Sequence, residues 1–259
     1  MIYNLMSAYK DYLLLRAYRP STAQTYYKRL CTILDGQSIT NTVSQLDIKK
    51  VLDKLGTIKH KNYFSQSKNA FLHFCEFQNI NLSADVLESI AELEKGTRKK
   101  YRKLSSIEYS QVDKKIKHIK NKKLKLCFQV MLATGLRVSE LASITRNDCL
   151  VEDDAITLNF IGKGGKREVV ALQATEHFFK LYQRLKEHIH ITPPDKKVFY
   201  SAVYLMNKAS ELGFKCHDLR RIYAHLEYKK CGAKIKVKEK MRHTNMKNTN
   251  RYLRSKVKF

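Results

Sequence analysis

Six polar side chains in the second half of the chain have the types and the order needed to cut a phosphodiester bond. They are Arg137, Lys163, His217, Arg220, His243 and Tyr252. A guanidinium is planar and can bind two phosphate oxygens at once, a lysine can protonate a leaving oxygen, and a tyrosine can attack as a nucleophile. No member of the set is decisive alone, but the order and spacing of all six predict phosphodiester cleavage without a metal ion.

The two arginines lie in contexts that could present them to a phosphate. Arg137 follows a predicted turn at Gly135 and starts a short helix, so its side chain can project from the end of an element. Glu140 comes three residues later and can orient it. His217 and Arg220, also three residues apart, would share one face of a helix.

The candidate lysine lies in the segment Ile161-Gly162-Lys163-Gly164-Gly165-Lys166. Its glycines predict the tip of a tight hairpin, from which a lysine could reach a leaving oxygen. Lys166 and Arg167 are near enough to be rivals for this role. A nucleotide-binding phosphate loop is not indicated, because the chain lacks Gly-x-x-x-x-Gly-Lys-Ser/Thr.

Tyr252 is one of 15 tyrosines, and its residue type alone would suggest only a packed aromatic. Its position distinguishes it from the others. It follows His243 by nine residues and lies in a polar run, residues 248–252, within a predicted final helix.

Together these motifs resemble those of the tyrosine recombinase (phage integrase) family, and most closely the Xer-like site-specific recombinases. The most specific is Ala-Thr-Gly-Leu-Arg-Val-Ser-Glu-Leu over residues 133–141. Ile-Gly-Lys-Gly, His-x-Leu-Arg and the spaced His and Tyr follow in the family's order. The resemblance covers about residues 104–259 in detail and 1–95 in outline.

The resemblance implies a role for each residue. Tyr252 would attack the scissile phosphate and form a 3′-phosphotyrosyl intermediate with a free 5′-hydroxyl. Arg137 and Arg220 would hold the non-bridging oxygens and stabilise the transition state, with Glu140 in support.

The remaining roles are proton transfer and phosphate binding. Lys163 would be the general acid for the 5′-oxygen, His217 would assist as general base, and His243 would hydrogen-bond the phosphate. The covalent link conserves the bond energy, so we expect no cofactor, neither a metal ion nor ATP.

The chain departs from the family's pattern at three places. Met241-Arg242-His243 stands where relatives often have Leu-Gly-His, so Arg242 should alter the backbone or add a phosphate contact. Arg221 stands where many relatives have His. Only seven residues follow Tyr252, although relatives dock a C-terminal segment into a neighbouring subunit.

Composition favours a polyanionic partner. The chain has 259 residues, 43% of them hydrophobic, and 50 basic against 24 acidic residues give a net charge of +26. Nucleic acid is the favoured partner, and an anionic membrane surface is the alternative. No stretch approaches the ~20 apolar residues of a membrane span, and residues 1–9 lack the basic region followed by an apolar run that a signal peptide has, so we expect a cytoplasmic protein. The six cysteines form no Cys-x-x-Cys pair, so neither a zinc site nor a disulfide framework is indicated.

The pattern of apolar residues predicts a mainly α (α+β) fold. Residues 1–95 form a helical core-binding, DNA-binding domain, with helices near 2–17, 21–34, 45–55, 58–78 and 83–94, the second capped by Ser21. Residues 96–104 form a basic linker. Residues 105–259 form a mostly helical catalytic domain that begins with a capping box, Ser105-x-x-Glu108. Three short strands, 149–152, 155–161 and 168–172, form a small antiparallel sheet, and the chain is helical from 174 to its end except at Pro193-Pro194.

The two domains and the basic linker could close around duplex DNA. The helix over 58–78 should bury Phe64, Phe71, Leu72, Cys75 and Phe77 and present its opposite face to the major groove. The DNA-binding candidates are Lys61, Asn62, Ser65, Lys68, Asn69, Arg98, Lys99, Lys100, Arg102, Lys103, Lys166, Arg221 and Arg242. For each candidate on the helix over 58–78, the alternative to reading bases in the major groove is a contact with the phosphate backbone alone.

The function we expect is site-specific recombination, whether integration, excision or resolution. The partners would be double-stranded DNA carrying a specific site, other copies of the chain in a tetramer, and an accessory DNA-bending protein. A type IB topoisomerase-like enzyme and a non-catalytic DNA-binding relative are the alternatives.

Overall fold

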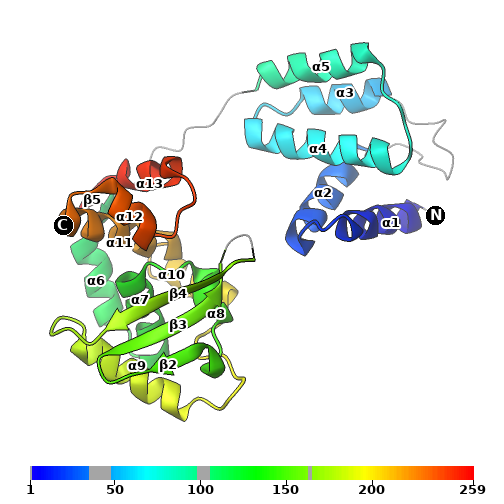
Figure 1. Cartoon of the computed structure of the whole chain (residues 1–259). Coiled ribbons are helices and arrows are strands. Elements are labelled where there is room, and N and C mark those ends of the chain that lie inside the picture. The colour runs from blue at the N-terminus through cyan, green and yellow to red at the C-terminus, as the bar shows by residue number, and fades with distance from the viewer. Residues whose placement is uncertain (1, 35–47, 98–105, 163–164) are drawn as a thin grey trace. The chain divides into compact units, whose positions relative to one another are not determined.

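The computed structural model describes residues 2–34, 48–97, 106–162 and 165–259. The chain divides into two compact units, Met1–Arg102 and Lys103–Phe259. Figure 1 shows the helices and strands of both units. Each unit has its own hydrophobic core. Within the described residues, no helix is long and apolar enough to cross a membrane.

The first unit is helical throughout its described residues. Its helices are α1 (Ile2–Leu15), α2 (Pro20–Ile33), α3 (Ile48–Gly56), α4 (Lys61–Phe77) and α5 (Ala84–Lys95). The core gathers around α4, whose Phe64, Phe71, Phe74 and Cys75 are buried. The buried Tyr9 of α1 donates a hydrogen bond from its hydroxyl to the carbonyl of Ala70, 2.8 Å away, and so ties α1 to α4.

The predicted buried face of α4 is correct only in part. Leu72 and Phe77 are only partly buried, and Phe74 takes a fully buried position. The rings of Tyr9 and Tyr12 lie 5.9 and 5.1 Å from that of Phe77. Phe77 thus contacts α1 although it is only partly buried.

The second unit is mainly helical with a small sheet, as the sequence predicts. Its helices are α6 (Tyr109–Lys117), α7 (Lys122–Thr134), α8 (Val138–Ser143), α9 (Phe179–Ile191), α10 (Ala202–Glu211), α11 (Cys216–Cys231), α12 (Lys234–Lys240) and α13 (Met246–Leu253). Its strands are β1 (Ile107–Glu108), β2 (Cys149–Val151), β3 (Ala155–Ile161), β4 (Arg167–Gln173) and β5 (Val257–Lys258).

The three-stranded sheet is antiparallel in the order β2-β3-β4. Cys149 lies opposite Leu158, and Ile161 lies opposite Arg167. The alternation of side chains along β3 buries Leu158 and Phe160 against the helices and leaves Ile161 outside, as a sheet with one covered face requires. Helices α7, α8 and α9 contact this sheet.

Two helix starts differ from the sequence prediction. Ser21 lies inside α2, which begins at Pro20 with Arg19 as its N-cap. Proline suits a first helical position because it has no N–H that needs a partner there. Glu108 belongs to β1 and is the N-cap of α6, so it does not close a capping box; Ser105 lies outside the described residues.

The end of the chain is a strand rather than helix. Strand β5 pairs in parallel with β1, Ile107 opposite Val257 and Glu108 opposite Lys258. The ring of Phe259 lies 5.7 Å from that of Tyr109, and the ammonium of Lys229 lies 3.6 Å from the Phe259 ring. The helical prediction fails here because this pairing joins segments about 150 residues apart, which no local pattern reveals.

Helix α11 positions the candidate site. It packs against α7, α10, α12 and α13 (Figure 1). Its Tyr223 and Ala224 form a small core with Val237, Met241 and Tyr252. The late tyrosine and the segment before it are thereby fixed to the helix that carries His217 and Arg220.

Candidate active site

Arg137 is held at the start of α8 by Glu140. It is the N-cap of that helix, with an extended backbone (φ −71°, ψ 150°), and its N–H donates to a Glu140 carboxylate oxygen 2.8 Å away. The guanidinium of Arg137 contacts the other oxygen of the same carboxylate. Because Glu140 binds both ends of Arg137, the side chain has a fixed direction while 25% of it stays exposed.

Arg220 is buried and held by backbone carbonyls. Only 1% of it is exposed. Its Nη1 donates to the carbonyl of Gly135 and its Nη2 to that of Met241. Its Nε has no hydrogen-bond partner among the described residues. Burial, followed by the charge of Arg137, lowers the pKa of Arg220 to about 10, so it is still a cation at neutral pH.

Tyr252 lies in α13 among three of the other candidates. The His217 and His243 rings lie 5.0 and 5.1 Å from its ring, and the Arg220 guanidinium lies 5.9 Å away. Tyr252 is 9% exposed, and its hydroxyl forms no hydrogen bond with a described residue. The structure thus brings Arg137, His217, Arg220, His243 and Tyr252 together.

The backbone carbonyl of Tyr252 is also held. It accepts hydrogen bonds from the hydroxyl of Ser255 and from Nε2 of His225, the latter 3.2 Å away. Sequence reasoning missed both residues. Helical spacing could not connect them to Tyr252, because His225 lies 27 positions earlier in another helix.

Both histidines beside Tyr252 favour their neutral form. His243 is buried, and its Nδ1 lies 2.9 Å from the Thr249 hydroxyl. Desolvation, with the charges of Arg220 and Arg137, lowers the pKa of His243 to about 4. His217 is exposed, but partial loss of water around its imidazole and the charges of Arg221 and Arg220 lower its pKa to about 4 as well. At pH 7 each ring has a nitrogen able to accept a proton or a hydrogen bond.

Arg242 is a third guanidinium beside Glu140. Its Nη2 lies 3.8 Å from a Glu140 oxygen, and its Nε lies 3.3 Å from a Glu168 oxygen. The nearest Arg220 nitrogen is 3.9 Å from a Glu140 oxygen. The buried carboxylate of Glu140 therefore lies within ion-pair distance of three arginines, Arg137, Arg220 and Arg242. Sequence reasoning missed Glu168, and the only available signal was the arginine at a position where relatives often have glycine.

Only some of the remaining candidates lie within the described residues. Lys163, Arg98, Lys99, Lys100, Arg102 and Lys103 are outside the described residues. Lys166 is exposed beside the β3–β4 connection. Arg221 makes a 3.0 Å ion pair with Asp218.

The α4 candidates belong to the first unit. Lys61, Asn62, Ser65 and Asn69 are exposed or partly exposed on that helix. Lys68 forms a 2.6 Å ion pair with Glu94 of α5.

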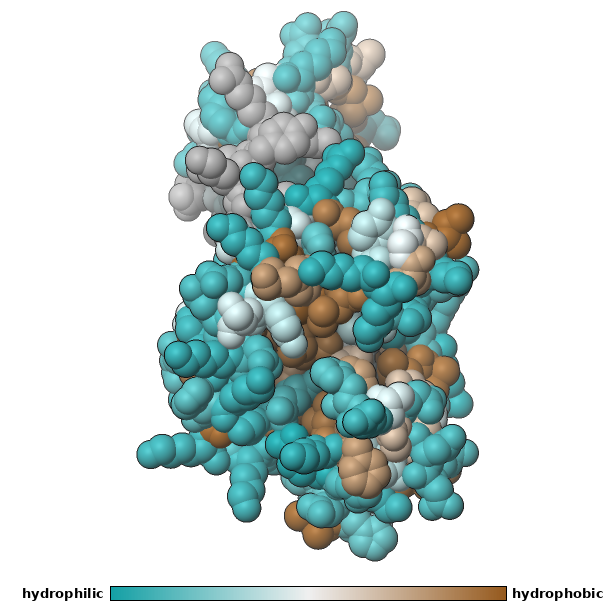
Figure 2. All heavy atoms as spheres, turned by 90° about the vertical axis from the view of Figure 1, so that its left-hand side faces the viewer, coloured by the Kyte–Doolittle hydropathy of each residue, from teal (hydrophilic) through white to brown (hydrophobic). Residues whose placement is uncertain are grey.

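Hydrophilic side chains predominate on the face of the molecule shown in Figure 2, in keeping with the high net charge.

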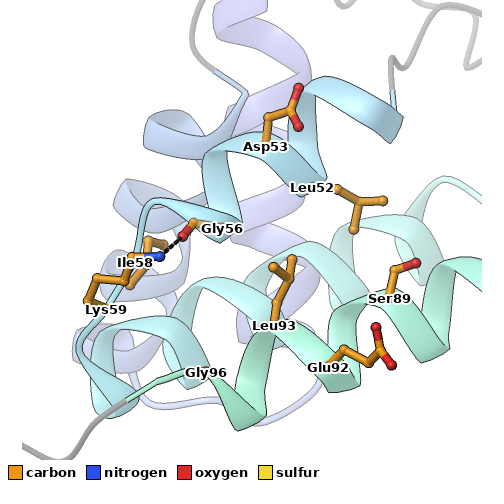
Figure 3. Close-up of a pocket in the computed structure, with 9 residues that line it drawn as sticks. All are labelled: Leu52, Asp53, Gly56, Ile58, Lys59, Ser89, Glu92, Leu93 and Gly96. Carbon is orange, nitrogen blue, oxygen red and sulfur yellow. Dashed lines mark hydrogen bonds between the residues drawn. The ribbon is translucent and has the colours of Figure 1, made fainter.

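A pocket of about 530 Å³ in the first unit is a poor candidate for phosphate chemistry (Figure 3). Its lining includes the acidic Asp53 and Glu92, which would repel a phosphate. The ammonium of Lys59, the one lysine or arginine among its described lining residues, is bonded to the carbonyl of Gly56, 2.9 Å away. Across the described parts of the chain, no three His, Cys, Asp or Glu residues are grouped so as to hold a metal ion.

Comparison with solved structures gives recombinases and integrases. XerH recombinase bound to its difH substrate is 18% identical, with a TM-score of 0.58 over 90% of this chain and 74% of that one. The Tn1549 transposon integrase in complex with transposon right-end DNA is 14% identical, with a TM-score of 0.62 over 96% and 94%. A lambda integrase tetramer bound to a Holliday junction is 15% identical, with a TM-score of 0.64 over 97% and 76%. At these identities the similarity establishes the fold.

Sequence comparison assigns the family. A search of curated proteins gave no match. The model of the phage integrase family matches residues 105–258, well over half of the chain and the whole of the region that contains Arg137, His217, Arg220, His243 and Tyr252. The chain belongs to the phage integrase family.

Proposed function

We propose that this chain, a site-specific recombinase by family, cuts DNA by covalent attachment of the 3′ end to Tyr252 and rejoins it to another strand. The observation that supports this role is the surrounding of Tyr252. Two neutral imidazoles and a buried guanidinium lie within 6 Å of its ring, centre to centre, while its hydroxyl is free of described partners. An attacking tyrosine needs a nearby base and a nearby positive charge.

The arginine cluster supports phosphate binding. Arg137, Arg220 and Arg242 surround Glu140, with Glu168 at the edge, so three cations face two carboxylates. The cluster therefore has one positive charge in excess, and a phosphodiester, which carries one negative charge, would neutralise it. The Arg220 Nε, buried without a partner, is a donor that a phosphate oxygen could satisfy.

We propose the following chemistry for these residues and Lys163. The Tyr252 oxygen attacks phosphorus while the bond from phosphorus to the 5′-oxygen breaks. His217 takes the phenolic proton, and Lys163 supplies the proton for the leaving 5′-oxygen. His243, neutral and anchored to Thr249, donates a hydrogen bond to a phosphate oxygen.

Rejoining reverses these steps. A 5′-hydroxyl from a partner duplex attacks the phosphotyrosine, loses its proton to Lys163 and releases Tyr252, which regains its proton from His217. The bonds broken and formed are of the same kind, so no external energy source is needed. Four copies assembled on two duplexes would exchange strands in this way, as an assembly of the kind seen for lambda integrase would allow.

The grip on DNA would come from both units. In our proposal residues 1–95 bind DNA through the exposed side of α4, and the basic residues 96–104 follow the phosphate backbone. The protein would act in the cytoplasm, where it meets its DNA.

The decisive experiment traps the covalent intermediate. Nicked suicide duplexes are prepared from DNA flanking the coding sequence, where inverted repeats would mark the site, and adducts are counted on a denaturing gel. Wild type should form the adduct and Tyr252→Phe should not. No adduct with wild type on any fragment, or an adduct with Tyr252→Phe, would refute the assignment.

Tyr223→Phe is the matched control. Tyr223 is also 9% exposed and lies in the same small core as Tyr252. Burial and Glu227 raise its pKa to about 12, which makes it a poor nucleophile, so this variant should still form the adduct. Transfer of label between two duplexes then separates recombination from relaxation by a topoisomerase-like enzyme.

A further inference from the structure

The side chain of Arg242 lies between two carboxylates that belong to different parts of the second unit. Glu140 is in α8, beside Arg137, and Glu168 is in β4. Only 13% of the Arg242 side chain is exposed, and its guanidinium lies 5.2 Å from the ring of Phe160 in β3. Its surroundings are therefore mostly protein.

The backbone at Arg242 is in a conformation that does not favour arginine. Its φ is +53°, in the left-handed region, which costs a residue with a Cβ roughly 1 kcal/mol. An arginine kept there instead of glycine should contribute something through its side chain. Besides the ring of Phe160 and a hydrogen bond from Nη1 to the carbonyl of Lys240, 3.2 Å away, its side chain makes the two ion pairs.

Glu168 connects Arg242 to the base of the β3–β4 hairpin. In the sheet register Glu168 lies opposite Phe160. Its carboxylate covers Gly162 so closely that a Cβ added there would lie 2.5 Å from the Glu168 carboxyl carbon. Gly162 in turn donates its N–H to the carbonyl of Lys166, 2.8 Å away, and closes the hairpin base.

We propose that Arg242 is a positioning residue that ties the base of the β3–β4 hairpin to Glu140, and through Glu140 to the phosphate-binding Arg137. The inference rests on the proposed function, because it concerns how the hairpin that delivers the leaving-group proton is held. In the sequence Lys163 directly follows Gly162. A hairpin base that shifts would misplace any proton donor that the hairpin carries.

A direct phosphate contact by Arg242 is the competing role. In its favour, the Nε and Nη2 of Arg242 are buried without a hydrogen-bond partner among the described residues. The role is nevertheless less favoured, because carboxylate oxygens already lie 3.8 and 3.3 Å from the guanidinium and would repel a phosphate. The two roles differ in the step that fails on substitution. Loss of a phosphate ligand weakens every cleavage reaction, whereas loss of hairpin position weakens only protonation of the leaving group.

A sulfur substitution in the DNA separates these steps. Suicide substrates are made with oxygen or with sulfur at the bridging 5′ position. A thiolate leaves without prior protonation because a thiol is a far stronger acid than an alcohol. Cleavage rates are measured for wild type, Arg242→Gln, Arg242→Gly, Glu168→Gln and Lys163→Ala, and thermal melting confirms that each variant is folded.

We expect Arg242→Gln and Glu168→Gln to cleave the oxygen substrate about 10- to 100-fold more slowly than wild type, the range typical of a small misplacement. On the sulfur substrate both should approach the wild-type rate. Arg242→Gly should lose the same activity although its backbone strain is relieved. Arg184→Gln, an exposed arginine of α9, should behave as wild type on both substrates.

Equal losses on both substrates, or a wild-type rate for Arg242→Gln on the oxygen substrate, would overturn the inference. The proposed function fails separately. An adduct with Tyr252→Phe refutes the nucleophile, and Lys163→Ala without sulfur rescue refutes only that lysine as the acid. Rescue of Arg242→Gln reports on the hairpin whichever of its residues donates the proton.

Discussion

Arg220 donates a hydrogen bond from Nη1 to the backbone carbonyl of Gly135, 85 residues earlier in the chain. Gly135 ends α7 in the left-handed conformation, with φ +63°. A Cβ at this position would lie 2.3 Å from the ring of Tyr223. The partner of a buried arginine is therefore supplied by a turn that only glycine fits.

Gly135→Ala should destabilise the second unit and slow cleavage. Backbone strain costs roughly 1 kcal/mol, and overpacking against Tyr223 adds about 1–3 kcal/mol. The movement of the Gly135 carbonyl should also displace Arg220. Urea unfolding measures the first effect and suicide-substrate cleavage the second.

Gly232→Ala is the matched control for this prediction. Gly232 also ends a helix with a similar φ of +64°, but no heavy atom lies within 4 Å of an added Cβ. Gly232→Ala should lower the free energy of unfolding only by the backbone strain, roughly 1 kcal/mol, and should leave the cleavage rate unchanged. Equal destabilisation by the two substitutions would contradict the role assigned to Tyr223.

The free energy of unfolding should fall as the pH is lowered from about 6.5 to about 4. Burial and the arginine cluster lower the folded-state pKa of His243 from 6.5 to about 4. The unfolded chain, with the ordinary pKa, therefore takes up a proton in this range that the folded chain excludes, and unfolding becomes easier. For His243 alone the effect is up to about 3 kcal/mol.

His243→Gln, which cannot be protonated, should reduce this pH dependence in urea titrations at fixed ionic strength. His190→Gln, at an exposed position of α9, should leave the dependence as it is. A His243→Gln protein with the full wild-type slope would show that His243 is readily protonated in the folded state.

Removal of residues 256–259 should destabilise the second unit by about 1–3 kcal/mol. The truncation uncovers Ile107, which is 6% exposed beneath β5, and removes the contact of Phe259 with Tyr109. Because the contact is within one chain, the difference in melting temperature should not depend on protein concentration. A concentration-dependent difference would indicate that the tail is bound by a second copy.

DNA binding should weaken steeply with salt, as a net charge of +26 implies. The two lysines of α4 should differ. Lys61→Ala should lower the log–log slope by about 1 if Lys61 contacts a phosphate. Lys68→Ala should lower it less, because Lys68 already pairs with Glu94. A flat plot for wild type, or equal changes for the two variants, would contradict this assignment.

The residues that the structure gathers around Tyr252 could be predicted from sequence because they lie in short motifs with a fixed chemistry. Arg137 and Glu140 are three positions apart, and so are His217 and Arg220, so helical geometry alone relates the members of each pair. Helical periodicity and β alternation similarly predicted most elements, including the three antiparallel strands.

What sequence reasoning missed depends on contacts between distant segments. Glu168, His225 and Ser255 lie in no recognisable motif. They contribute only because the fold brings Glu168 to Arg242 and brings His225 and Ser255 to the carbonyl of Tyr252. The strand at the chain's end was missed for the same reason, since Val257 pairs with Ile107, which lies near the other end of the second unit in sequence. Local propensity does not contain this information.

The hydrogen bonds to the Tyr252 carbonyl have a mechanical consequence. Ser255 and His225 both bind this carbonyl, and their donor atoms lie 3.4 Å apart. Strand β5 begins only two residues beyond Ser255, at Val257. A force that separates β5 from β1 would therefore be transmitted to the backbone of Tyr252 through only the five residues 253–257. A connection this short can extend little before the Tyr252 backbone moves.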